Sequence, residues 1–297
     1  MNIHSQAPSA ENISWLRDRV NGIHQRNRQQ GSASWCGHSY DFTCPSHETY
    51  PFQWFWDSCF HAIALSHIDT NKAEAELFSL LKNQHADGFI SHVTFWQRDV
   101  YEEMVSTYDI AFRTKYLSDE MQPPLLAEAV NAVAQRGRGK DFLKEILPGV
   151  IRFYEWCHAV RSPYNNGLIR VIQPDETGLD HSPKWDELMK IKDEEHSSFE
   201  RGWKLICDQY LPFNRDPEQM IATDYFVVAD VMVNVIYIEN LRVLAQLCAA
   251  IGDAEGEKRY AERATIARKS LDELCWDESD GLYYDVNGKS NTKIRVN

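Results

Sequence analysis

Apolar residues recur every three or four positions along most of the chain, which is the spacing of amphipathic helices. This spacing predicts nine helical segments, two of them short, which together correspond to roughly eight full helices. The segments are residues 11–29, 53–67, 70–83, 122–135, 140–161, 184–192, 194–208, 222–251 and 253–275. Alternating helix and strand patterns are missing, which argues against a doubly wound sheet. The predicted fold class is therefore all-α.

Some segments depart from regular helical spacing. Pro148 lies inside 140–161 and predicts a kink or a break, because proline removes a backbone donor. Residues 222–251 are apolar on nearly all sides, which predicts burial on most of the helix surface. Residues 31–52 show no period and predict a loop. Two turn signals near the end of the chain predict hairpins: Asp280–Gly281 and Asn287–Gly288.

The domain organisation follows from length and from the absence of repeats. The 297 residues are in the range of one large domain, and we treat residues 1–297 as a single unit. No repeat of fixed period is visible, which argues against a tetratricopeptide-type solenoid. Helical hairpins without sequence repeats fit an irregular bundle or an α/α toroid, and periodicity alone does not separate these two.

Composition restricts the partners and the compartment. The formal net charge of −13 argues against a nucleic-acid partner, which needs a basic face. Seven cysteines without zinc-site spacing favour free thiols in a reducing compartment, so a cytoplasmic location is expected. An uninterrupted run of 18 apolar residues is missing, so no membrane partner is expected. Nucleotide, phosphate and metalloprotease motifs are also missing, so no cofactor and no metal are expected.

An aromatic and acidic motif runs from Tyr50 to His61, with the sequence YPFQWFWDSCFH. On a helix, Trp54, Asp57 and His61 share one face. A carboxylate between two indoles is costly to bury unless it has a partner, and a sugar hydroxyl would be such a partner. A capping or salt-bridged aspartate at a helix start explains the spacing equally well.

A second motif, QPDETGLDHSPKWD, begins at Gln173 and places three carboxylates within six positions. They are Asp175, Glu176 and Asp180. Crowded carboxylates raise each other's pKa, which keeps an acid protonated near neutral pH and able to protonate a glycosidic oxygen. A solvated acidic loop or a cation site fits the same spacing.

Two further segments leave alternatives open. Gln122, in the segment Met121-Gln-Pro-Pro-Leu, has an amide that could bond to a pair of hydroxyls or cap a helix. Residues 87–96 fit a short aromatic strand on a rim or a part of the core. Nine Trp and thirteen Tyr fit a sugar cleft, although core packing explains many such rings.

Taken together, these motifs resemble glycoside hydrolase family 63, in particular its bacterial branch related to mannosylglycerate and glucosylglycerate hydrolases. The pieces that carry the resemblance lie in the family's order and cover nearly the whole chain. They are Trp54-Phe-Trp56-Asp57-Ser-Cys-Phe-His61, Asp87-Gly-Phe-Ile, Gln122-Pro-Pro, Glu176-Thr-Gly178-Leu-Asp180-His-Ser-Pro183 and Asp230-Val-Met-Val-Asn234. The resemblance implies an (α/α)6 toroid that hydrolyses a small α-glucoside or α-mannoside with inversion.

The resemblance also implies roles for individual residues. Asp180 matches the general acid of the family. The residues that match its sugar-binding positions are Tyr50, Trp54, Trp56, Asp57, Gln122 and Glu176. An inverting enzyme also needs an ionised base on the opposite face of the sugar.

The chain departs from the family pattern in two places. Asp175 stands where the family tends to have an aromatic residue, which puts the preference for the leaving group in doubt. The family's base is a Glu in the C-terminal part of the barrel, and we expect it beyond residue 297, with roughly eight of twelve helices present. An open toroid would expose apolar helix flanks, so self-association through that edge is expected.

Two other function classes fit the same residues. The chain could be a carbohydrate-binding remnant that keeps the aromatic subsite without a base, or a helical scaffold that binds another protein. An Asp180→Asn substitution separates an enzyme from a binding remnant, because it abolishes turnover and leaves ligand binding in place.

Overall fold

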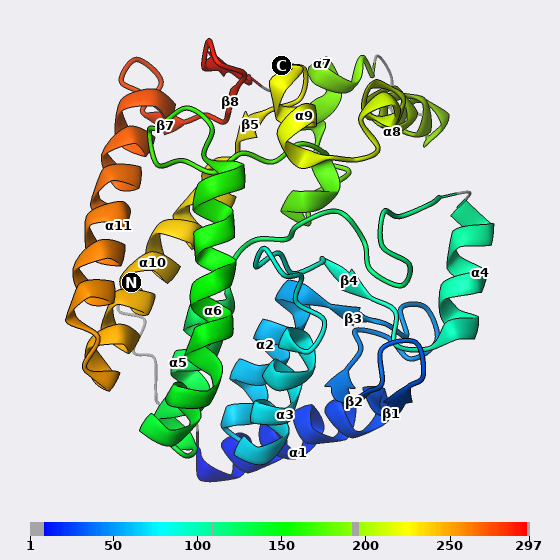
Figure 1. Cartoon of the computed structure of the whole chain (residues 1–297), viewed down its shortest axis with the longest axis vertical. Coiled ribbons are helices and arrows are strands. Elements are labelled where there is room, and N and C mark those ends of the chain that lie inside the picture. Colours follow the sequence, from blue (N-terminus) through cyan, green and yellow to red (C-terminus); the bar gives the residue numbers. More distant parts are fainter. Residues whose placement is uncertain (1–8, 109, 192–195, 296–297) are drawn as a thin grey trace.

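The computed structural model describes residues 9–108, 110–191 and 196–295, and they form a mainly helical molecule (Figure 1). The α-helices are α1 (Ala10–Asn27), α2 (Phe55–Ser66), α3 (Thr70–Leu81), α4 (Arg98–Tyr108), α5 (Leu126–Arg136), α6 (Lys140–Arg161), α7 (Asp186–Met189), α8 (His196–Tyr210), α9 (Pro217–Ala222), α10 (Val231–Ile251) and α11 (Ala254–Cys275). Short 3-10 helices are η1 (Pro174–Thr177), η2 (Pro183–Trp185) and η3 (Leu211–Phe213). The junction of the two helices predicted at 184–192 and 194–208 falls on residues 192–195, outside the described residues.

Short antiparallel strands join the helices. They are β1 (Arg28–Ala33), β2 (His38–Thr43), β3 (Gln53–Trp54), β4 (Val93–Thr94), β5 (Val228–Ala229), β6 (Trp276–Asp277), β7 (Leu282–Tyr283), β8 (Val286–Asn287) and β9 (Thr292–Lys293). The pairs are β1–β2, β3–β4 and β6–β7, and β8 lies between β5 and β9. The turns predicted near the end of the chain are confirmed, because they connect β6 to β7 and β8 to β9.

The long helices of the described residues pack as hairpins, namely α2–α3, α5–α6 and α10–α11. Within this set α5 contacts both α2 and α10, so α2, α5 and α10 form an inner row. Helices α3, α6 and α11 cover that row. Within this outer layer, the side chains of Tyr260 and Arg263 in α11 donate hydrogen bonds to Glu155 in α6. Figure 1 shows α6 crossing the middle of the molecule, with α10 behind it and α11 along one side.

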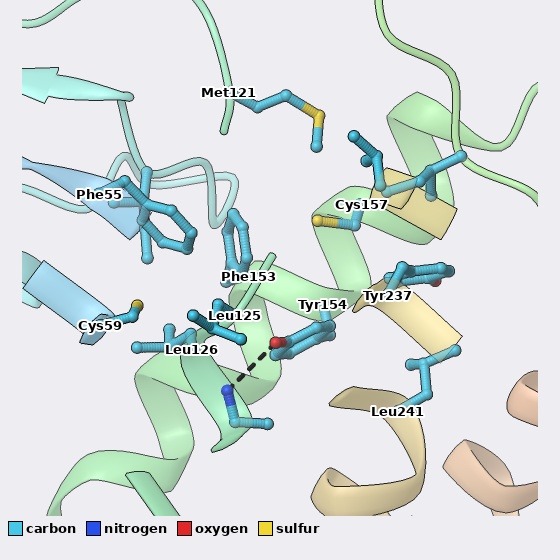
Figure 2. Close-up of a cluster of buried hydrophobic side chains, with 14 of the residues drawn as sticks. Phe55, Cys59, Met121, Leu125, Leu126, Phe153, Tyr154, Cys157, Tyr237 and Leu241 are labelled. Atoms are coloured by element: carbon cyan, nitrogen blue, oxygen red, sulfur yellow. Dashed lines mark hydrogen bonds between the residues drawn. The ribbon is translucent and has the colours of Figure 1, made fainter. Parts of the chain in front are cut away.

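The core lies between these two layers of helices. Figure 2 shows Phe55 and Cys59 of α2 facing Phe153 and Tyr154 of α6, with Leu241 of α10 beyond them. The Tyr154 hydroxyl accepts a hydrogen bond from the Ala127 N–H at 3.2 Å and lies 2.7 Å from the Pro124 carbonyl oxygen. A buried phenol must satisfy its hydroxyl, so this pair of contacts fixes the start of α5 against α6.

Helix α10 has the burial that its sequence predicts. It is long and apolar enough to cross a membrane by composition, but 61% of the relevant window is buried inside the molecule. Such burial is typical of a core helix in a packed domain. The helix begins at Val231, whereas the spacing predicted a start at 222, because residues 228–229 pair as β5 with β8.

The prediction of a loop over 31–52 is wrong for its first half. Strands β1 and β2 form a hairpin, with Gly37 at φ +73 in the connection. In β2, the buried Tyr40 and Phe42 are separated by the half-buried Asp41 and pack on Trp96 and Cys44. Thr43 is also buried, so the alternation ends at Phe42. The alternation of buried and polar residues covers only a few positions of a segment rich in Gly, Ser and His. It is therefore too short to be recognised as a strand from the sequence.

One helix prediction is corrected at its boundary, and of the two alternatives predicted at Pro148, a kink or a break, the break is excluded. Residues 122–125 belong to no helix or strand, and α5 begins at Leu126 rather than at Gln122. Pro148 does not break the chain into two helices, because α6 runs from Lys140 to Arg161. Pro148 is on the exposed side of α6, where solvent can satisfy the carbonyl that loses its backbone donor.

Candidate active site

The candidate site lies where the N-terminal ends of α2 and α5 meet. The backbone N–H of Trp56 in the first turn of α2 donates to Gln122 Oε1 at 3.0 Å. Trp54 is the N-cap of α2 and supplies no side-chain cap, so Gln122 provides an acceptor from another segment. Gln122 is only 3% exposed. This bond joins two of the motifs singled out in the sequence and caps α2, not α5.

Aromatic rings line one side of the site. The Trp54 ring centroid lies 6.0 Å from that of Tyr50 and 5.2 Å from that of His92, both edge to face. Tyr50 is 47% exposed. The buried Nε1 of Trp54 has no hydrogen-bond partner among the described residues. An indole N–H without a partner, next to an exposed ring, is available to a hydroxyl of a ligand.

Asp57 lies in the first turn of α2 and is half-buried. Burial raises the pKa of Asp57, while its own backbone N–H and the nearby His92 act in the opposite direction. Across the described part of the chain, no side chain donates a hydrogen bond to this carboxyl group. Its oxygens can therefore accept hydrogen bonds from a ligand.

The loop that carries Asp180 reaches this site through Gly178. Gly178 ends η1 with φ +70, and a Cβ built there would lie 2.4 Å from Trp56 Cζ2. The Gly178 backbone therefore rests directly on the Trp56 indole. Asp180 follows two residues later and is half-buried. The structure thus brings the Trp-Asp motif and the loop of Asp180 into contact.

Glu176 is completely buried beneath this loop. Its carboxylate pairs with the Arg161 guanidinium at 2.6 and 3.1 Å. It also accepts hydrogen bonds from the backbone N–H of Met121 at 3.1 Å and of Ile172 at 2.8 Å. These protein donors fix η1 against α6 and against the segment that carries Gln122.

The far end of the same loop is anchored to α10. The Trp185 indole N–H donates to the Leu179 carbonyl at 2.8 Å. Lys184 pairs with Asp230, the N-cap of α10, and with Asp285 at 2.8 Å. Asp230 is 0% exposed, so the lysine neutralises a buried carboxylate at the start of α10.

A group of charged residues beside the site was not predicted from the sequence. Glu120 Oε1 lies 2.6 Å from Arg215 Nη1, and Glu120 Oε2 lies 3.4 Å from His92 Nδ1. Burial alone would raise the pKa of Glu120, but His92 and Arg215 together lower it to about 2. Burial and the adjacent Glu120 raise the pKa of Asp119 to about 7. Their position in the sequence, directly before Met121-Gln122, could have indicated that Asp119 and Glu120 lie beside the site.

Asp175 belongs to the same group. The Trp203 indole N–H of α8 lies 3.3 and 3.2 Å from its two oxygens. Burial raises the pKa of Asp175 to about 6, and the carboxylates of Glu120 and Asp180 add to this shift. The predicted crowding of carboxylates thus acts on Asp175, in addition to burial, and one of the neighbours, Glu120, comes from outside the motif.

The structure brings most of the predicted site residues together. Tyr50, Trp54, Trp56 and Asp57 lie on or beside the start of α2, with Gln122 bonded to this turn. Glu176 instead lies below the site, where protein groups bond to its carboxylate. Phe95 and Trp96 of the aromatic segment are buried, next to β4. Within the described ranges, no group of His, Cys, Asp and Glu side chains could hold a metal ion.

Comparison with known proteins places this chain in a family. Residues 50–297 match the model of the mannosylglycerate hydrolase MGH1-like glycoside hydrolase domain. Mannosylglycerate hydrolase of Thermus thermophilus is 29% identical over 270 residues, which cover 82% of this chain and 64% of the relative. Glucosylglycerate hydrolase of Mycolicibacterium hassiacum is 26% identical over 234 residues, which cover 67% of this chain and 52% of the relative. The chain therefore spans about half to just under two-thirds of the length of these relatives.

A solved structure shows the same fold. The family 63 mannosylglycerate hydrolase of Thermus thermophilus, crystallised with Tris and D-glycerate, superposes with a TM-score of 0.76. The match is 24% identical and covers 95% of this chain and 70% of that chain. The expected all-α, (α/α)6 toroid-type glycosidase fold is confirmed.

Proposed function

We propose that this chain, which belongs to the mannosylglycerate hydrolase MGH1-like glycoside hydrolase family, binds a small α-glucoside or α-mannoside and bears the general acid of an inverting α-glycosidase. Sugar binding and hydrolysis are separate parts of this proposal, because the chain spans about half to just under two-thirds of the length of the curated relatives.

The contact between Gly178 and the Trp56 indole carries this proposal. It places the loop of Asp180 against the turn that presents Asp57 and the aromatic rings. A glycosidase needs this combination, because the sugar ring must be held while an acid protonates the bond to the leaving group. A helical scaffold would have no use for it.

Each group has a distinct task in this proposal. Tyr50, Trp54 and Trp56 supply ring faces and an indole N–H to the sugar, and Asp57 accepts from its hydroxyls. Asp180 protonates the glycosidic oxygen as the leaving group departs. Gln122 contributes through the cap that it gives to α2. Glu176 acts indirectly, since its oxygens hold the loop in place instead of binding the sugar.

The proposal is tested with α-glucosylglycerate, α-mannosylglycerate and the methyl α-glycosides of the same sugars. Calorimetry measures binding, and proton NMR follows hydrolysis. Inversion releases the β-anomer of the sugar first, before mutarotation. Asp57→Ala is expected to remove binding. Asp180→Asn is expected to keep binding and to abolish hydrolysis. Failure of the wild-type chain to bind any of these glycosides contradicts the proposal.

The partial span of the relatives favours one second candidate, a sugar-binding chain without hydrolysis. The two candidates differ in a single result. If the wild-type protein binds methyl α-glycosides and produces no free sugar over a long incubation, the binding function replaces the hydrolytic one. If free sugar appears and Asp180→Asn stops it, the hydrolase is retained.

A further inference from the structure

Helix α1 lies along the lower edge of the molecule in Figure 1 and is buried only near its C-terminal end. Residues 9–19 are exposed along their whole length. Of the residues Ala10–Asn27, His24 alone is buried, at 7% exposed. Three residues later, the Asn27 Nδ2 donates to the Pro45 carbonyl at 3.0 Å. The docking of α1 therefore depends on a few contacts in its C-terminal half.

The buried contact of α1 is a pair of histidine rings. The His24 ring packs edge to face on the His61 ring of α2, with 5.3 Å between the ring centroids. His24 Nδ1 lies 3.5 Å from the Thr43 hydroxyl oxygen in β2, at the outer limit of a hydrogen bond. The buried Nδ1 of His61 has no hydrogen-bond partner among the described residues. A neutral imidazole tolerates this environment better than an imidazolium, because both nitrogens of an imidazolium are donors that need acceptors.

Burial and nearby cations both favour neutral rings. Burial lowers the pKa of His24, and the charges of Arg28 at the start of β1 and Lys72 in α3 add to this shift. Burial also lowers the pKa of His61 to about 4; His24 and Arg28 act in the same direction, and the Thr43 backbone opposes them. An unfolded histidine titrates near about 6.5, so the packed rings stay neutral at a pH where freed rings take up protons.

The carboxyl groups on the neighbouring elements lie against these cations. Asp41 of β2 lies 2.5 Å from Arg28 Nε, and Glu76 of α3 lies 3.7 Å from Arg28 Nη1. Asp69, the N-cap of α3, lies 3.7 Å from Lys72 Nζ. A proton added to either histidine therefore creates a cation beside other cations, in a place where burial weakens screening by solvent.

We propose that the contact between His24 and His61 holds α1 to the molecule at neutral pH and releases it when the rings are protonated. Groups with lowered pKa values contribute stability above the unfolded value of about 6.5, and this contribution is lost as the pH falls below it. Release costs little apolar burial, because Ile13, Leu16 and Ile23 are exposed in the docked helix. The inference is independent of the proposed function.

Hydrogen exchange of the whole chain, followed by mass spectrometry, tests this release. The chain is labelled at about pH 7.5 and at about pH 5, and the rates are corrected for the pH dependence of intrinsic exchange. Protection over residues 20–27 is expected to fall by at least about tenfold at about pH 5. Returning the pKa of His61 from about 4 to about 6.5 corresponds to at most about thirtyfold at this pH.

Helix α10 is the internal reference, because α5 lies between it and α2 in the inner row. Its protection is expected to stay the same at both pH values. Unchanged protection over residues 20–27 overturns the proposal. An equal loss of protection in α10 also overturns it, since the acid then unfolds the whole molecule instead of releasing α1.

Variants assign the effect to the two rings. The double variant His24→Phe/His61→Phe keeps two rings at the contact and removes their titration, so its protection over residues 20–27 is expected to change by less than about twofold. His67→Phe makes the same substitution at the exposed C-cap of α2 and is expected to release α1 as the wild type does. Release of the double variant at the wild-type pH overturns the proposal.

The single variants cover the case in which the double variant does not fold. His24→Phe and His61→Phe each remove one of the two protonation sites and the repulsion between the rings. Each is expected to move the midpoint of release to lower pH by at least about half a unit. A midpoint that neither variant moves overturns the assignment to these histidines.

Discussion

Gly178 is the residue at which the two parts of the candidate site touch. Replacing it with alanine adds a Cβ that would overlap the Trp56 indole and puts a side chain at φ +70. The left-handed conformation alone costs about 1 kcal/mol, and the overlap adds about 1–3 kcal/mol. We therefore predict that Gly178→Ala lowers the free energy of unfolding, measured in urea, and changes the tryptophan fluorescence of the folded protein.

Gly37 provides the matched control for this prediction. It has φ +73 in the β1–β2 connection, and an added Cβ there meets nothing within 4 Å. Gly37→Ala therefore carries only the conformational cost. If the two variants lose the same stability, the contact between Gly178 and Trp56 does not hold the loop in place.

Glu176 shows how an acid within a candidate catalytic motif can have a structural task. Its carboxylate is fully buried with the Arg161 guanidinium. Removing one partner of a buried pair leaves the other charge without compensation and costs about 3–5 kcal/mol. We predict a loss of this order in the free energy of unfolding for Glu176→Gln. Glu187→Gln, at an exposed position nearby, is expected to be neutral. A neutral Glu176→Gln would contradict the anchoring role.

At the scale of elements, the loop of Asp180 depends on the N-terminus of α10. Lys184→Met leaves Asp230 and Asp285 facing each other without a cation. We predict that this variant loses about 2–4 kcal/mol of stability, because two buried carboxylates remain uncompensated. We also expect faster amide exchange over residues 179–185. Lys204→Met, on the exposed side of α8, is the control. Unchanged exchange in Lys184→Met would show that the loop is held by other contacts.

The elements that the sequence predicted well are those whose apolar spacing persists over several turns. Helices α2, α3 and α11 begin and end within two or three residues of their predicted bounds, because each has one continuous buried side. The inner position of α10 was also predictable, since a helix that is apolar all round has to be buried. Predicted helix boundaries were wrong where a short strand replaces the first turns of the predicted helix, as β5 does before α10.

The candidate site was predictable only in part. Trp54, Trp56 and Asp57 could be grouped because they share a turn of helix, whereas the partners of the loop lie far away in the sequence. Arg215 is 95 residues from Glu120, and Gln122 is 66 residues from Trp56. Helical periodicity carries no information on such pairs. The cap that Gln122 gives to α2 depends on how two separate segments meet in the folded chain.

At the scale of the whole molecule, the chain is acidic, and the fold raises the pKa of some of its carboxyl groups. Burial raises the pKa of Glu76 to about 8. Arg28 Nη1 lies 3.7 Å from Glu76 and favours the ionised form, but its Nε lies closer to Asp41, at 2.5 Å, so burial dominates. Asp119 is shifted in the same direction, to about 7. At a pH between the unfolded and the folded pKa values, the folded protein therefore retains protons that the unfolded chain has released.

These shifts predict how stability depends on pH. A carboxyl group whose pKa is raised on folding stabilises the protein at low pH, and this contribution is lost as pH rises through the folded value. Buried histidines such as His61 have lowered pKa values and act in the opposite direction, but only below about pH 6.5, where an unfolded histidine is protonated. Between about pH 6.5 and 8, the carboxyl groups decide the sign.

We therefore predict that the free energy of unfolding falls by about 1–2 kcal/mol between pH 6.5 and 8, since each pKa unit corresponds to about 1.4 kcal/mol. The Thr43 N–H and the Ser58 hydroxyl bond to different oxygens of Glu76, each at 2.7 Å. Glu76→Gln keeps an acceptor for the Thr43 N–H, offers an N–H to the Ser58 oxygen, and removes the titration. Urea unfolding at a series of pH values is expected to show a much flatter profile for this variant, and an unchanged profile for the exposed control Glu262→Gln. If the wild-type profile is flat or rises over this range, Glu76 is ionised in the folded protein and Arg28, rather than burial, sets its charge.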